Sequence, residues 1–166
     1  ANRGNGLTGK ASIYFGGAVM NNTPDVVLLG SVSNDQFGYS VSGAGDVNGD
    51  GYADVIVGAW GNDVGGADAG RAYLYLGGAS MNNIADLTLT GHAAGDVFGV
   101  TVAGGGDVNG DAYDDVIIGA WGNDAGGGDA GRAYVFFGGV QLDAIADVIT
   151  TGAVAGDNFG ASVAGA

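Results

Sequence analysis

Two nine-residue loops carry the residue types that could do chemistry. The first reads DVNGDGYAD over 46–54 and the second reads DVNGDAYDD over 107–115. Each places side-chain oxygens at its positions 1, 3, 5 and 9, and the backbone carbonyl at position 7 adds another. Calcium takes about six to eight such oxygens, whereas magnesium keeps several of its waters. The sequence therefore predicts two Ca²⁺ ions, one per loop, with the ligands Asp46, Asn48, Asp50, Tyr52 and Asp54, and Asp107, Asn109, Asp111, Tyr113 and Asp115.

Two other interpretations of these loops compete with a calcium site. An EF-hand loop begins in the same way but needs an acid at position 12, where this chain has Val57 and Ile118. A metal-free turn rich in Asp, Asn and Gly is the simpler alternative. The same full set of oxygens in both loops favours calcium. Position 6 is Gly51 in the first loop and Ala112 in the second, so a left-handed turn there would weaken the second site.

The composition excludes several classes of function. All 18 acidic residues are aspartate, only four residues are Lys or Arg, and the net charge is −14. Such a surface repels nucleic acid and anionic membranes, and no apolar run is long enough to insert into a bilayer. The chain has no cysteine and one histidine, His92, so a nucleophile with a partner base is not indicated. We expect no enzymatic activity.

The chain contains an internal sequence repeat with a period of 61 residues. Residues 37–78 and 98–139 are identical at 30 of 42 positions. Almost every aspartate recurs at this period, and only Asp114 and Asp143 fall outside it. Acids placed so regularly belong to a structural unit rather than to a random solubilising coat.

Each repeat predicts four short strands. In the middle unit these are 37–44, 54–60, 70–78 and 86–91, rich in β-branched and aromatic residues and separated by glycine. Side-chain alternation predicts that one of two registers forms the core, either that of Leu74 or that of Tyr75. Four strands per repeat indicate an all-β propeller with blades of four antiparallel strands.

The units divide the chain into four parts. Residues 1–36 hold the last two strands of one blade, 37–97 and 98–158 are complete blades, and 159–166 hold the first strand of another. These eleven strands make about 2.75 blades, whereas a closed propeller needs roughly four to eight. The sheet therefore stays open unless other copies or further sequence complete it.

The ordered motifs resemble the FG-GAP repeats of the integrin α-subunit propeller and of bacterial secreted proteins. Phe37-Gly38, the loop 46–54 and VIVGAW match in order, and Phe98-Gly99, the loop 107–115 and VIIGAW match again. Trp60 and Trp121 stand where the family usually has proline. The resemblance implies an extracellular, calcium-stabilised propeller, and family members bind proteins, bind sugars or accompany catalytic domains.

We therefore expect a non-catalytic, calcium-binding segment of a secreted or cell-surface protein, acting in adhesion or recognition. One alternative is a subunit that assembles head to tail into a ring or filament through its open blade ends. Another is a lectin, with Trp60 and Trp121 stacking on sugar rings. For these tryptophans, packing between blades is the simpler role. The sequence does not identify the protein or glycan ligand.

Overall fold

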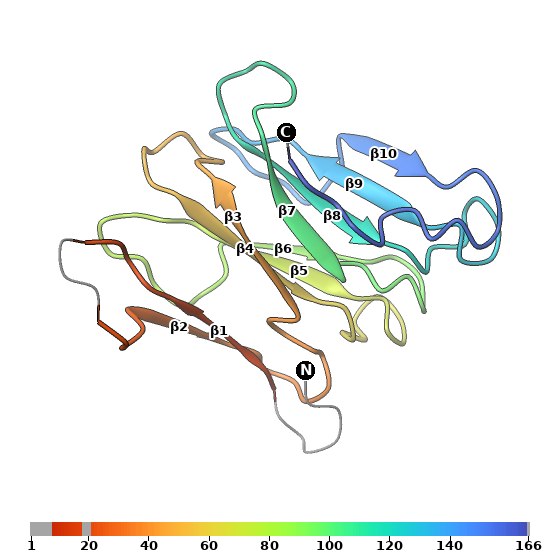
Figure 1. The fold of residues 1–166 in the computed structure, drawn as a ribbon, viewed down its shortest axis with the longest axis horizontal. Helices are drawn as coiled ribbons and strands as arrows, with labels where there is room; N and C mark the ends of the chain where they lie inside the picture. Colours follow the sequence, from red (N-terminus) through yellow and green to blue (C-terminus); the bar gives the residue numbers. More distant parts are fainter. Residues whose placement is uncertain (1–7, 18–20, 166) are drawn as a thin grey trace.

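The computed structural model describes residues 8–17 and 21–165, and this part of the chain is all β, with three antiparallel sheets (Figure 1). No helix that could cross a membrane occurs among these residues. The strands are β1 (Lys10–Ile13), β2 (Val26–Leu29), β3 (Ser40–Gly45), β4 (Asp54–Ala59), β5 (Arg71–Tyr75), β6 (Leu87–Thr90), β7 (Thr101–Gly106), β8 (Asp115–Ala120), β9 (Arg132–Phe136) and β10 (Val148–Thr151).

Two of the sheets are complete four-stranded meanders. Their strand orders are β3-β4-β5-β6 and β7-β8-β9-β10, and each neighbouring pair is antiparallel. We call these sheets blade A and blade B. The pair β1-β2 forms a third, two-stranded sheet, the N-terminal partial blade. The predicted fold class, open propeller blades of four antiparallel strands, is confirmed.

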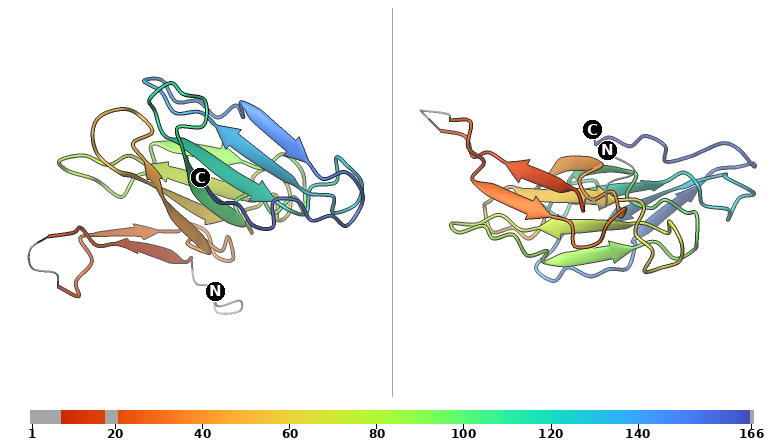
Figure 2. Two further views of the ribbon diagram at one scale, coloured as in Figure 1. Left: turned by 45° about the horizontal axis from the view of Figure 1, so that its top comes forward. Right: turned by 90° about the horizontal axis from the view of Figure 1, so that it is seen from below.

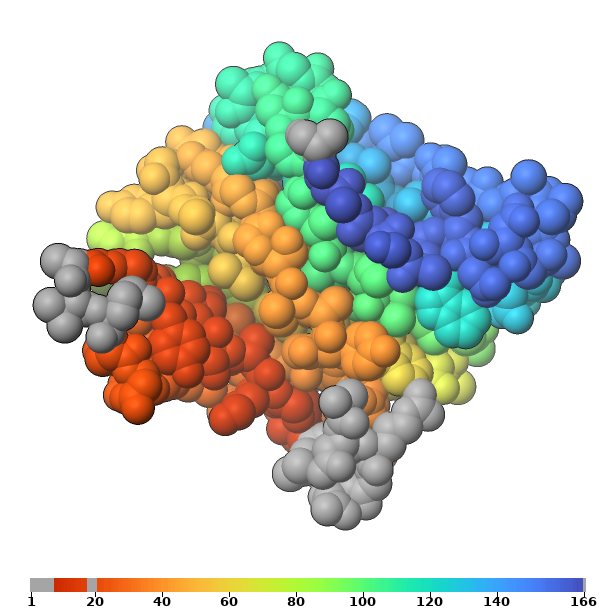
Figure 3. Space-filling view, viewed as in Figure 1, coloured from red at the N-terminus to blue at the C-terminus, as the bar shows by residue number. Residues whose placement is uncertain are grey.

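The predicted eleventh strand does not form. Residues 159–165 make only an isolated bridge, between Phe159 and Gly131. In blades A and B the first strand pairs with the strand that follows its loop, and the described residues include no such partner for this segment. The segment instead lies along β7, where Gly165 approaches the carbonyl of Gly104. Figure 3 shows its dark blue residues beside the green residues of β7.

The sheets stack face to face, so that blade A is covered on both sides (Figure 2). Successive side chains of a strand point to opposite faces. Ile56 and Leu74 therefore pack toward blade B, whereas Val57 and Tyr75 pack toward the partial blade. The expectation that only one of the two registers forms core is wrong for this blade, because Leu74 and Tyr75 are both buried.

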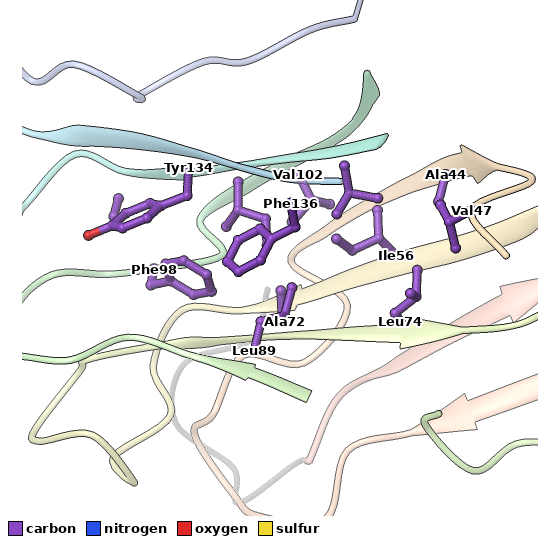
Figure 4. Packing of buried hydrophobic residues seen from close by; sticks show 13 residues of the cluster. Ala44, Val47, Ile56, Ala72, Leu74, Leu89, Phe98, Val102, Tyr134 and Phe136 are labelled. Carbon is purple, nitrogen blue, oxygen red and sulfur yellow. The ribbon is translucent and has the colours of Figure 1, made fainter. Parts of the chain in front are cut away.

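The larger of the two cores lies between blades A and B (Figure 4). At one end of this core the ring of Phe98 meets the ring of Tyr134 edge-on, with centroids 5.2 Å apart. Leu89 and Ala72 of blade A face these rings. Phe37 makes the equivalent edge contact with Tyr73 in blade A, at 5.5 Å. Phe37 and Phe98 are thus core residues at blade junctions, whereas their repeat mate Phe159 is 41% exposed.

Backbone contact between glycines sets how closely the blades approach. Gly99, which follows Phe98, has φ +81° and turns its carbonyl toward β4 of blade A. A Cβ on Gly58 would lie 1.9 Å from that carbonyl oxygen, and the Ser40 hydroxyl donates to the same oxygen at 2.8 Å. Gly119, Gly160 and Thr101 repeat this arrangement one period later, with the same 1.9 Å approach. The Phe-Gly pair of one blade therefore seats against the Gly-Ala pair of the blade before it.

This contact predicts that Gly58→Ala destabilises the protein by about 1–3 kcal/mol, because the new methyl group meets a backbone oxygen that cannot move without shifting blade B. Gly43→Ala is the matched control. Gly43 lies in the paired strand β3, and a Cβ there meets nothing within 4 Å. Its effect should stay within about 0.5 kcal/mol. Urea unfolding curves of the three proteins measure the difference, and equal midpoints for the two variants would contradict the proposed contact.

Candidate metal centre

Each candidate loop joins the first and second strands of its blade. Loop 46–54 runs from β3 to β4, and loop 107–115 runs from β7 to β8. Each loop is preceded by a bulge, where the strand register shifts at Gly43/Gly45 and at Gly104/Gly106. The bulge bends the strand as it enters the turn. Each predicted loop segment therefore lies between the first two strands of its blade.

In each loop, backbone N–H groups donate hydrogen bonds to side-chain oxygens of the same loop. The Asp46 carboxylate accepts from the N–H of Asp50 at 3.0 Å and from that of Gly51 at 2.8 Å. Asp50 accepts from the Tyr52 N–H at 2.9 Å, and its other oxygen accepts from the Asn48 amide at 3.0 Å. The side-chain oxygens at positions 1, 3 and 5 are thus occupied by N–H groups of the loop itself.

The second loop repeats this pattern. Asp107 accepts from the N–H groups of Ala112, at 2.8 Å, and of Gly110 and Asp111. Because the Ala112 N–H bond favours the charged form, the pKa of Asp107 lies below its usual value. Asp107 and Asp111 are exposed, so their charges face water in this loop.

The ninth residue of each loop is buried and differs from the other ligand candidates. Asp54 and Asp115 are fully buried. The two oxygens of Asp54 accept from Val47 N–H at 2.8 Å and from Gly77 N–H at 2.6 Å. Burial raises the pKa of Asp54 despite these bonds. Asp54 therefore links the loop to the end of β5, and Asp115 does the same through Val108 and Gly138, at 2.8 Å each.

The turn at position 6 is left-handed in both loops. Gly51 has φ +87° and Ala112 has φ +74°. The condition under which we expected a weaker second site is therefore met. An L-residue in this conformation costs roughly 1–2 kcal/mol more than glycine, so the second loop is the more strained of the two. Whether this lowers its cation affinity stays a prediction.

The donor set fits a hard cation in its chemistry. At positions 1, 3, 5, 7 and 9 each loop supplies three carboxylates, one amide oxygen and one main-chain carbonyl. Each oxygen that accepts an N–H retains a second lone pair for a cation. Among the described residues no three acidic or histidine side chains already converge as a preformed metal cluster. Cation binding would therefore require the side chains at positions 1, 3 and 5 to turn inward from their present bonds.

The two tryptophans have different surroundings. Trp60 follows β4 and packs edge-on against Tyr39, with ring centroids 5.9 Å apart. Trp121 follows β8, where the equivalent of Tyr39 is Val100, and 36% of its surface is exposed. Trp60 therefore packs on a residue of its own blade, and packing between blades stays a prediction for both tryptophans.

Two sets of polar residues near the loops and blade junctions have roles that were not predicted from the sequence. Buried Asp96 accepts from the Asn123 amide at 3.0 Å, and Asp35 pairs in the same way with Asn62 one period earlier. Their 61-residue register was visible, but their partners lie 27 residues away in the chain. The other is Asp114, which fell outside the repeat and lies beside loop 46–54.

Two comparisons relate the chain to known proteins. Residues 37–75 and 81–136 each match an FG-GAP repeat family. The chain is 31% identical to integrin alpha-5 of Xenopus laevis over 122 residues, which is 70% of this chain and 11% of that protein. It is 39% identical to integrin alpha pat-2 of Caenorhabditis briggsae over 101 residues, or 56% and 8% of the two chains. The chain thus spans about a tenth of these relatives' length.

Asp54 and Asp50 should respond differently to loss of charge in the presence of a chelator. Asp54→Asn places an NH₂ group against a backbone donor in a buried site, so we expect a loss of about 1–3 kcal/mol in unfolding free energy. Asp50→Asn changes an exposed side chain and should cost less than about 0.5 kcal/mol. Chemical denaturation measures both, and equal losses would show that burial of Asp54 has no structural role of its own.

Proposed function

Since the chain belongs to the FG-GAP repeat family of integrin-alpha-like β-propellers, we propose that it is a calcium-stabilised, non-catalytic propeller segment of an extracellular or cell-surface protein. In this proposal it serves in adhesion or recognition. The observation that carries the proposal is the pair of loops, 46–54 and 107–115, with the same oxygen donors at the same place in consecutive blades. FG-GAP repeats and the integrin-alpha relatives support the adhesion class.

The proposed calcium is structural. When bound, the ion supplies positive charge to a turn that holds three carboxylates. The residues at positions 1, 3 and 5 would hold it from the loop, and the buried residue at position 9 would hold it from the start of the second strand. The ion would thereby connect the two strands that each loop joins. Asp54 and Asp115 already anchor this strand end by their bonds to Gly77 and Gly138.

The ligand for recognition is proposed only by class. A net charge of −14 favours a protein or glycan surface over a polyanion. Trp121, at 36% exposure, is the tryptophan that could stack on a sugar ring, whereas Trp60 packs on Tyr39.

Calcium should raise the melting temperature. For a Kd of roughly 10⁻⁴–10⁻³ M, free calcium about a hundredfold above Kd stabilises a one-site protein by about 2.7 kcal/mol. In a domain of this size that is roughly 5–10 °C per site. Differential scanning calorimetry with calcium and then with chelator measures the shift. Magnesium at the same concentration should give a smaller one.

The matched control is the double variant Asp50→Asn with Asp111→Asn. Both residues are exposed, so the fold in chelator should be retained while each loop loses a carboxylate ligand. Its melting temperature should respond little to calcium. A native protein that melts at the same temperature in calcium and in chelator would refute the calcium proposal.

A second candidate function is assembly through the open face of the partial blade. In blade A, one edge of β5 pairs with β4. The repeat equivalent of β5 in the partial blade is β1, which among the described strands pairs only with β2. The other edge of β1 is therefore unpaired. Val41 is 56% exposed there, whereas its repeat mate Val102 is 8% exposed, and a groove of about 510 Å³ lies between β1 and β3. We propose that this face pairs with another copy of the chain, because unpaired edges beside apolar surface favour association.

If this face is the assembly surface, the protein forms a discrete oligomer or polymer in calcium, and Val41→Lys shifts it to monomer. Val32→Lys is the control, because Val32 is an equally exposed loop residue away from the groove, at 53%. Light scattering behind a sizing column measures the mass of all three proteins. A monomer at high concentration, in calcium and in chelator alike, would exclude assembly.

A further inference from the structure

The two candidate loops contact each other directly across the junction between blades A and B. The backbone N–H of Asp46 donates to the Asp114 carboxylate at 2.7 Å, and the N–H of Asp114 donates to the Asp46 carbonyl at 3.2 Å. A third bond runs from the Gly139 N–H to the Val47 carbonyl at 2.7 Å. The first residue of loop 46–54 is therefore held at both its N–H and its C=O by one residue of loop 107–115.

Packing reinforces these bonds. Val47 is 2% exposed beneath blade B, whereas its repeat mate Val108 is 53% exposed. The ring of Tyr113 lies against Gly49, where a Cβ would approach it to 2.6 Å. Loop 46–54 is therefore covered by the loop of the next blade, and loop 107–115 has no such cover within the described residues.

Asp114 has no counterpart in the repeat. The equivalent position in the first loop is Ala53. Asp114 therefore cannot be assigned to the common ligand set, which both loops possess without it. Its carboxylate reaches the neighbouring loop instead, and it lies so close to Gly45 that a Cβ there would meet it at 2.1 Å.

We propose that Asp114 is a positioning residue that couples the two loops, so that a divalent cation in loop 107–115 strengthens binding in loop 46–54. This inference rests on the calcium proposal above. Asp114 immediately precedes Asp115, so ordering of the second loop also orders the carboxylate that holds Asp46. The Asp46 side chain in turn accepts the Asp50 and Gly51 N–H groups, which shape the first loop. Coupling between two binding sites is reciprocal, so the first loop must strengthen the second by the same factor.

The test follows each loop separately by NMR, using the amide signals of Gly51 and Ala112 during calcium titration. Asp107→Asn removes cation binding from loop 107–115. Relative to the native protein, we expect this variant to bind calcium in loop 46–54 about fivefold more weakly, or weaker still, as is typical for coupled sites. Asp114→Ala alone should lower it to a similar extent. The double variant Asp107→Asn with Asp114→Ala should bind calcium in loop 46–54 as weakly as Asp114→Ala alone.

Asp143→Ala is the charge-matched control. Asp143 also lies outside the repeat, is exposed, and accepts only the nearby Ile145 N–H, so its loss should leave both affinities unchanged. Hydrogen exchange in chelator gives a readout that needs no cation. Exchange of the Asp46 N–H should quicken in Asp114→Ala and stay unchanged in Asp143→Ala.

The outcomes separate the two proposals. Calcium binding to both loops with no loss of affinity in Asp114→Ala would overturn the coupling and leave the calcium proposal standing. Absence of calcium binding in the native protein would overturn both. Unchanged exchange of the Asp46 N–H in Asp114→Ala would overturn the coupling whatever the cation data show.

Discussion

The arrangement of the blades depends on the approach of one carbonyl group to a glycine. The Gly99 carbonyl fills the space that a side chain on Gly58 would need, and the Gly160 carbonyl does the same at Gly119. At this separation the side chains of Phe98 and Leu89 belong to a common core. The phenylalanine, the hydroxyl of Ser40 and the Gly-Ala pair are therefore parts of a single junction, although they are far apart in sequence.

The loops solve a different problem, which is to place several carboxylates in a tight turn. Some of their charge is stabilised by amides, as at Asp46 and Asp107. Asp54 and Asp115 are instead taken into the interior, where each satisfies two backbone donors from different segments. A single loop thus combines solvent-facing acids with one buried acid. The buried acid connects the turn to the body of the blade, which makes loop and sheet one structural unit.

Much of this structure could be predicted from sequence because the repeat shows each feature twice. The four-strand unit and the place of both loops follow from local patterns, whereas the left-handed backbone at Ala112 could be stated only as a condition. What could not be predicted depends on neighbours in space. Alternation along β5 could not tell that both Leu74 and Tyr75 are buried, since this requires a blade on each side. The segment 159–165 has the sequence of a strand but lacks a pairing partner, and Asp114 gains its role only through a contact 68 residues away.

The glycine junction also bears on how such a chain could grow. Each 61-residue unit carries the Phe-Gly half of one junction at its beginning and the Gly-Ala half of the next within its second strand. A tandem duplication of the gene segment would therefore copy both halves of the junction, the Phe-Gly pair and the Gly-Ala pair, together. New blades could be inserted or lost without inventing an interface, and the 30 identities in 42 positions are the expected trace of such copying. For the same reason, a substitution in one half of the junction would be tolerated only with a matching substitution in the adjacent unit. Neighbouring blades would therefore change in sequence together at these positions.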